Sequence, residues 1–214
     1  ITERGYIPLL VGGTMLYFKV LLEGIAELPP VDAAIRQQIL SDAEQLGWQA
    51  MHQRLASVDP STAAALHPNH SQRIQRALEV YYISGETLSS HQERQHFEGL
   101  PYRVAQLALW ADERSELHAR IAQRFNQMLR QGLVDELRTL RRNFDLHPDM
   151  PSMRSVGYRQ SWDYLEKRIS SQQLREQGEA ATRQLAKRQL TWLRKWPHLH
   201  RLSANFDQGQ VASH

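Results

Sequence analysis

Residues 181–196 of this 214-residue chain gather five cations, two glutamines and two tryptophans in a helical pattern. At about 100° per residue, Arg183, Lys187 and Arg194 share one face of such a helix. Trp192 falls on the opposite, apolar face. A helix that docks by its aromatic side chains and turns cations outward suits a phosphate-rich partner. The alternative is the solvated basic face of a surface helix.

The tripeptide Gly12-Gly13-Thr14 follows an apolar run at residues 7–11 and precedes a helical pattern from Met15 to Leu22. The order predicts a buried strand, a glycine turn and a helix, which is a βα unit of a parallel sheet. Amides in such a turn face the sheet edge where α/β proteins bind ligands, and Thr14 can add a hydroxyl. The alternative is a plain helix cap with two flexible residues.

Arg114, Arg120 and Arg124 lie on a helix predicted from Asp112 to about Gln131. The pattern places Arg124 inside the apolar stripe of that helix and Arg120 at its border. A buried arginine needs an anionic partner. A diphosphate would serve, and an unseen Asp or Glu would serve equally well.

At a predicted loop-to-helix junction, Arg154 and Arg159 flank Gly157 and Tyr158. Such a junction can hold a backbone phosphate and stack a base on the tyrosine ring. The alternative is an ordinary helix start with Tyr158 packed inward.

Gln72, Arg73 and Arg76 share the outward face of a helix predicted over residues 71–84. Glutamine and arginine suit base edges and phosphates, although a solvated face explains them as well.

We predict that the elements that position these side chains form an α/β core of residues 1–30 and 99–214 with an all-helical insertion at 31–98. Asp32 and Asp59 are predicted helix caps, Gly47 a helix end, and Leu46 an inward residue. We expect residues 86–100 to form a loop. Strands are expected within residues 102–110 and 198–202.

The composition, with 41% hydrophobic and 23% charged residues, is that of an ordinary globular protein. No cysteine is present, which excludes disulfides and thiol chemistry. The ten histidines show no spacing typical of a metal site, so we expect none. No apolar stretch approaches membrane-spanning length, and we expect no membrane partner and a cytoplasmic location. The 22 arginines against four lysines favour nucleic acid or diphosphate as a partner.

Four ordered segments, at 7–18, 72–80, 155–160 and 181–194, resemble the tRNA dimethylallyltransferase (isopentenyltransferase) family. The resemblance extends over roughly residues 1–202. It implies a P-loop-kinase-like parallel-sheet core with a helical insertion that contacts tRNA. It also implies transfer of a dimethylallyl group from dimethylallyl diphosphate, with Mg²⁺, to N6 of the adenosine 3′-adjacent to the anticodon. We expect a monomer.

The resemblance implies roles for particular residues. Thr14 would lie beside the reacting adenine, and Arg114, Arg120 and Arg124 would be catalytic residues that contact the diphosphate. The tRNA-binding set would be Gly12, Gly13, Arg36, Gln72, Arg73, Arg76, Arg154, Ser155, Val156, Gly157, Tyr158, Arg159, Gln160, Arg183, Lys187, Arg188, Gln189, Trp192, Arg194 and Lys195.

In that family an N-terminal portion supplies the glycine-rich phosphate loop with its lysine, and an aspartate that accepts the proton from the adenine amine. Neither is found in this sequence. We therefore expect a chain that lacks the first part of the family and is inactive alone, though able to bind RNA. A prenyltransferase acting on free adenine nucleotides and a non-catalytic RNA-binding helical module are the alternative functions.

Overall fold

The computed structural model describes residues 1–95, 97 and 99–203 as a helix-rich fold with a small parallel sheet. The chain divides into a helical unit, Leu16–Arg103, and a sheet unit, Ile1–Met15 with Val104–His214. These divisions differ from the predicted boundaries at 30/31 and 98/99. The role of residues 31–98 as a tRNA-contacting insertion stays a prediction. Across the described residues, no helix combines the length and apolarity that a membrane crossing needs.

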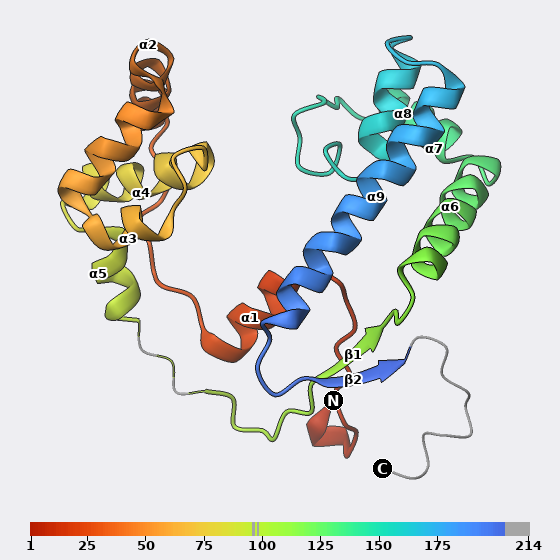
Figure 1. The fold of residues 1–214 in the computed structure, drawn as a ribbon, viewed down its shortest axis with the longest axis horizontal. Coiled ribbons are helices and arrows are strands. Elements are labelled where there is room, and N and C mark those ends of the chain that lie inside the picture. The colour runs from red at the N-terminus through yellow and green to blue at the C-terminus, as the bar shows by residue number, and fades with distance from the viewer. Residues whose placement is uncertain (96, 98, 204–214) are drawn as a thin grey trace. The chain divides into compact units, whose positions relative to one another are not determined.

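The helical unit contains helices from successive stretches of chain (Figure 1). They are α1 (Met15–Glu23, whose first residue belongs to the sheet unit), α2 (Ala33–Val58), α3 (Pro60–Ala65), α4 (Ser71–Ser84) and α5 (Leu88–Glu93). Its core joins α2 to α4: Ile39, Met51, Leu55, Ile74 and Leu78 are at most 1% exposed. Full burial of a side chain of this size contributes about 1.5–3 kcal/mol.

Local signals explain where these helices begin and end. The Asp32 carboxylate accepts from the amides of Ala34 and Ile35, which confirms the predicted cap of α2. Gly47 has φ 80° and breaks the helical geometry inside α2, as its type predicts. Asp59 caps α3 through the Thr62 amide at 3.0 Å.

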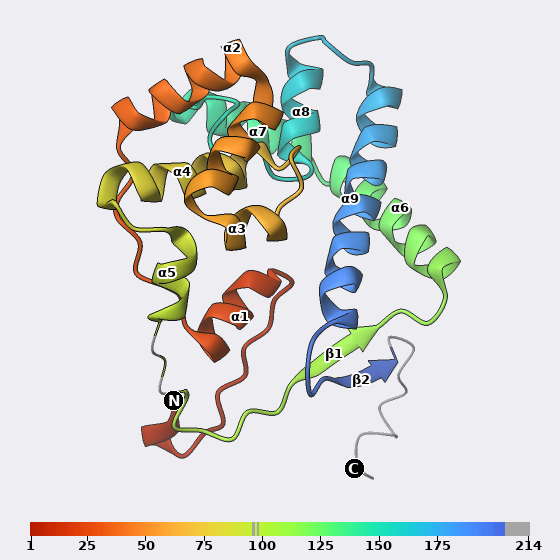
Figure 2. The ribbon, with the colours of Figure 1, turned by 60° about the vertical axis from the view of Figure 1, so that its left-hand side comes forward.

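In the sheet unit, β1 pairs with β2 in parallel, with Leu107 opposite His200 and Trp110 opposite Ser203 (Figure 2). Between them along the chain lie four helices. The elements are η1 (Thr2–Arg4), β1 (Leu107–Trp110), α6 (Arg114–Arg130), α7 (Leu133–Asn143), α8 (Tyr158–Leu165), α9 (Ser171–Arg194) and β2 (His200–Ser203).

The crossing of α6 and α9 depends on a glycine. A Cβ atom built on Gly178 would lie 1.9 Å from Cζ of Phe125, whose ring is buried. The absence of a side chain at Gly178 therefore lets the two helices approach closely. A second small core joins α7, the following loop and α8 through Leu137, Met153 and Trp162.

Three expectations about elements are wrong. Residues 7–11 form no strand within the described chain: Ile7 is 93% exposed, and no described strand pairs with this segment. Residues 86–100 contain α5, because the Thr87 hydroxyl caps it through the Ser90 amide. Leu46 is exposed, since Gly47 redirects the chain beside it.

Candidate functional site

The glycine turn at residues 12–14 lies against α9 within the sheet unit. The side-chain amide of Gln189 donates to the carbonyl oxygen of Gly13 at 2.8 Å, across 176 residues of sequence. A Cβ on Gly13 would lie 2.3 Å from the same nitrogen, so the backbone of the turn and the glutamine are in close contact. The predicted motifs at residues 7–18 and 181–194 are therefore in contact.

The polar face of α9 carries cations that differ in their surroundings. Arg183 pairs with Glu179 at 3.6 Å, one turn earlier, which engages part of its charge. Lys187, Arg188 and Arg194 are exposed, and we find no ion pair for them within the described residues. The end of α9 therefore presents a cationic surface next to the glycine turn.

Aromatic residues fix this end of α9. The rings of Trp192 and Trp196 lie 6.4 Å apart. The indole N–H of Trp196 donates to the Gln106 side chain, immediately before β1. Trp192 remains 38% exposed. An exposed indole beside unpaired cations can stack on a base, so the predicted contact of Trp192 with RNA stays open.

Residues 154–160 form the predicted loop-to-helix junction. Gly157 has φ 100°, a conformation that favours glycine, and its amide donates to the Gln160 side chain at 2.9 Å. Arg154 and Arg159 are exposed on either side of this turn, and Ser155 and Val156 precede it. The phosphate-binding role of the junction stays a prediction.

Tyr158 packs inward, which is the alternative given above. It contacts the core formed by Leu137, Met153 and Trp162, and its hydroxyl donates to the Glu136 carboxylate. This hydrogen bond, followed by burial, raises the pKa of Tyr158 above its ordinary value. The ring would have to leave this contact before it could stack on a base.

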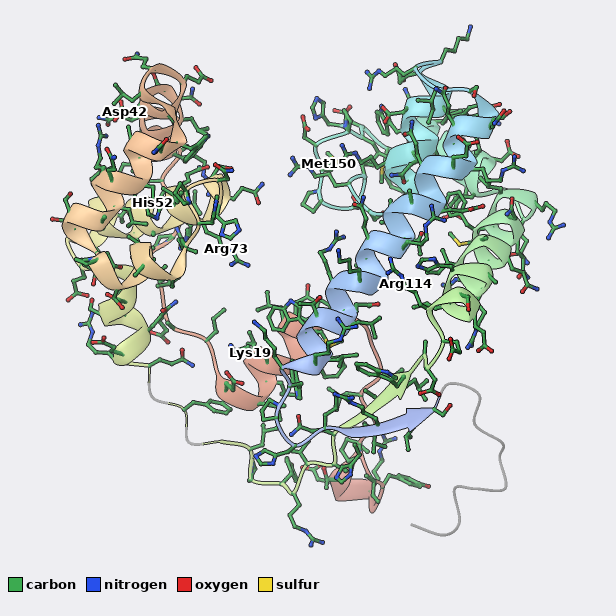
Figure 3. The ribbon with its side chains drawn as sticks, viewed as in Figure 1. Lys19, Asp42, His52, Arg73, Arg114 and Met150 are labelled. Carbon is green, nitrogen blue, oxygen red and sulfur yellow. The ribbon has the colours of Figure 1, made fainter. Side chains whose placement is uncertain are left out.

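The three arginines assigned to the diphosphate all lie on α6 and are exposed. Burial on this helix is confined to Ile121 and Phe125, so the expectation that Arg124 lies within the packed stripe is wrong. Exposure removes the need for an anionic partner inside the fold. Arg114 donates to His118 at 3.5 Å, and Figure 3 shows Arg114 at the start of α6. The diphosphate role of these residues stays a prediction.

In the helical unit, Arg36 and Arg76 converge on Glu79, a residue that the sequence analysis missed. The Glu79 carboxylate accepts from Nε of Arg36 at 2.7 Å and from a terminal nitrogen of Arg36 at 3.2 Å. It also accepts from Gln75 at 2.9 Å and from Arg76 at 3.4 Å. The sequence did contain a signal for this contact. Glu79 is an acid within the buried stripe of α4, and it follows Arg76 by three residues and Gln75 by four.

Glu79 remains ionised despite its burial. Burial alone raises the pKa of this carboxyl, but hydrogen bonds from Arg36 and Gln75 and the charge of Arg36 outweigh it and hold the pKa below its ordinary value. Gln72 and Arg73, on the same helix, are exposed (Figure 3, Arg73). The cluster thus places a buried negative charge beneath a cationic surface.

The part of the chain that the structure describes contains no group of three His, Cys, Asp or Glu side chains placed to hold a metal ion. The expected Mg²⁺, bound together with the diphosphate, stays a prediction.

Comparison with solved structures gives consistent matches. A tRNA isopentenylpyrophosphate transferase from Bacillus halodurans is 31% identical, with a TM-score of 0.60, and the match covers 98% of this chain and 64% of that one. A tRNA delta(2)-isopentenylpyrophosphate transferase from Staphylococcus epidermidis is 31% identical with a TM-score of 0.53, covering 97% and 66%. A eukaryotic dimethylallyltransferase acting on tRNA is 26% identical with a TM-score of 0.73, covering 98% and 54%.

The chain thus spans between 54% and 66% of the length of these proteins. Residues 1–196 match the model of the IPP transferase family. That match includes the glycine turn, the cluster around Glu79, the junction before α8 and all of α9. The chain therefore belongs to the IPP transferase family.

Proposed function

We propose that this chain is the larger part of an enzyme that transfers a dimethylallyl group from dimethylallyl diphosphate to N6 of the adenosine 3′-adjacent to the anticodon in tRNA. Membership of the IPP transferase family supports this proposal. So does the likeness to solved transferases whose names give tRNA as the substrate.

The observation that carries the proposal is the bond between Gln189 and Gly13 at 2.8 Å. It joins a turn suited to close ligand approach to the helix with the densest run of cations in the chain. A flipped adenine in the turn and the surrounding RNA backbone on α9 would then be bound by adjacent surfaces. Free adenine nucleotides would have no use for the extended basic helix.

In the reaction, the N6 amine forms a bond to the allylic carbon while the bond from that carbon to the diphosphate oxygen breaks. The amine loses a proton, and the electron pair of the broken bond leaves with the diphosphate. Thr14 would orient the adenine, and Arg114, Arg120 and Arg124 would stabilise charge on the departing oxygens. Mg²⁺ would be carried in with the diphosphate.

An incomplete core fits the same proposal. Leu9, Val11 and Leu109 are apolar side chains at least 74% exposed, on the segment after η1 and on β1. Apolar side chains on the strands of a parallel sheet are normally covered by helices that pack on its two faces. We propose that the remaining portion of a P-loop-kinase-like core covers them and supplies the phosphate loop and the proton acceptor. The 214 residues alone would then be inactive.

The test uses an anticodon stem-loop RNA, dimethylallyl diphosphate and Mg²⁺, with mass spectrometry of the RNA. The 214-residue chain is compared with a polypeptide extended by the family's N-terminal portion. We expect one dimethylallyl group on the target adenosine with the extended form only, and none when guanosine replaces that adenosine. Turnover by the shorter chain would refute its proposed inactivity. Tight RNA binding by both forms without any adduct would favour a non-catalytic RNA-binding module. Modification of free adenine nucleotides would favour a prenyltransferase that acts on those nucleotides.

A further inference from the structure

The Glu79 cluster of the helical unit contains more hydrogen-bond donors than its one carboxylate can use. Glu79 is 0% exposed within the α2–α4 core, whereas the side chains of Arg36 and Arg76 are 44% and 29% exposed. The acid therefore lies beneath its two partners, whose side chains remain partly exposed.

The donors can be followed atom by atom. A guanidinium has five N–H groups. Arg36 uses two on Glu79, from Nε and one terminal nitrogen. Arg76 uses one on Glu79 and one on the carbonyl oxygen of Pro29, at 2.8 Å. With Gln75 as a further donor, the Glu79 carboxylate is saturated, so the remaining N–H groups of both arginines need acceptors from outside the cluster.

Stability alone does not require this arrangement. A buried ion pair can often be replaced by apolar side chains of similar volume with little loss of stability. One carboxylate also leaves the pair of arginines with a net positive charge, and exposed Arg73 adds to it three residues from Arg76. Two guanidiniums fixed by bidentate and bridging bonds are instead suited to an anion with several oxygens.

We infer that Glu79 is a positioning residue that holds Arg36 and Arg76 as a preset pair for one backbone phosphate of RNA. This inference rests on the proposed function, because it takes its RNA ligand from there. Holding both guanidiniums before binding lowers the conformational entropy lost when the phosphate is bound.

The charge change makes a sharp test. Glu79→Gln removes a negative charge, and long-range electrostatics alone would then tighten RNA binding. Loss of the preset pair would weaken it. Asp42→Asn is the matched control, because Asp42 is a carboxylate of the same unit that pairs with Arg54, away from this cluster. The assay is fluorescence anisotropy of a labelled anticodon stem-loop with the 214-residue chain over a series of salt concentrations.

For Glu79→Gln we expect binding about three- to tenfold weaker, and a slope of log affinity against log salt that falls by about one. Asp42→Asn should bind as the wild type does, or slightly more tightly. Thermal melts followed by circular dichroism check that each variant is folded. If Glu79→Gln does not fold, Arg36→Lys keeps the charge but cannot form the paired bonds, and it should show the same weakening, while Arg54→Lys should not.

The outcomes separate the two proposals. Suppose that the wild-type chain binds the stem-loop and that folded Glu79→Gln binds it equally well or more tightly. This result overturns the positioning role and leaves the proposed function standing, and the same holds for Arg36→Lys where that variant is used. A wild-type chain with no affinity for the stem-loop overturns the preset pair as an RNA site. The proposed function is then decided separately, by whether the extended polypeptide forms the dimethylallyl adduct.

Discussion

Replacing Gly178 by alanine should destabilise the sheet unit, although the same change stabilises most helices. In a helix interior, alanine is favoured over glycine by about 0.5–1 kcal/mol. Here the new Cβ would lie 1.9 Å from Cζ of Phe125 and 2.4 Å from Cε1. The ring would have to retreat by about 1.5 Å to reach ordinary contact.

The size of the effect follows from these opposing terms. Overpacking a buried site costs about 1–3 kcal/mol, and a rigid ring that is 3% exposed has little room to move. After subtracting the propensity gain, we expect Gly178→Ala to lower the free energy of unfolding by about 1–2 kcal/mol.

Urea denaturation followed by circular dichroism measures this change. Gln177→Ala, at the preceding exposed position of α9, is the control and should change stability by less than about 0.5 kcal/mol. Phe125→Leu should make room for the alanine, so the double variant should lose less than the sum of the two single losses. A Gly178→Ala protein more stable than the wild type would refute the close crossing of α6 and α9.

Three further predictions concern single side chains. Asp59→Ala should lower the free energy of unfolding by about 1–3 kcal/mol in urea denaturation, because Asp59 caps α3 and also accepts from the Ser89 amide at 3.1 Å; an unchanged midpoint would contradict this. Because the folded pKa of Glu79 lies below its ordinary value, the stability that its carboxylate contributes is present above the ordinary pKa and is lost as the pH falls through the folded pKa. Melting temperatures should therefore drop on acidification, and drop less in Glu79→Gln; parallel pH curves would contradict this. Gln189→Ala should expose the Gly13 turn to faster proteolysis and cost about 0.5–1.5 kcal/mol, since it removes the bond at 2.8 Å; unchanged cleavage at the turn would count against that contact.

Helices whose ends carry a strong local signal could be predicted closely from sequence. Residues 71–84 form α4 as predicted, closed by Gly85, and Asp59 with Pro60 begins α3. Both signals act within one helical turn, so they need no knowledge of the rest of the fold. The segment at residues 7–11 shows the opposite case. Its apolar run is typical of a buried strand, but a strand exists only with a pairing partner, and the described chain supplies none.

The sequence allowed us to predict which residues belong to the site, but not which of them contact one another. The glycine turn and the basic helix could be found from their composition, but the bond from Gln189 to Gly13 joins positions too far apart in sequence for any periodicity to relate them. Arg36 and Arg76 were identified as cations, whereas the carboxylate that unites them lies in a stripe that otherwise reads as core. Arg124 shows the limit of helical periodicity: it lies close to the apolar stripe of α6 and is still exposed.

We propose that the glycine turn and α9 together bind the target adenosine. Photocrosslinking tests this proposal most directly. An anticodon stem-loop with an azido-adenosine at the position 3′-adjacent to the anticodon would be irradiated with the 214-residue chain, and the crosslinked peptides mapped by mass spectrometry. We predict crosslinks within residues 12–14 and 183–195, abolished by an excess of unlabelled stem-loop. Crosslinks confined to other parts of the chain, while the RNA remains tightly bound, would contradict the account.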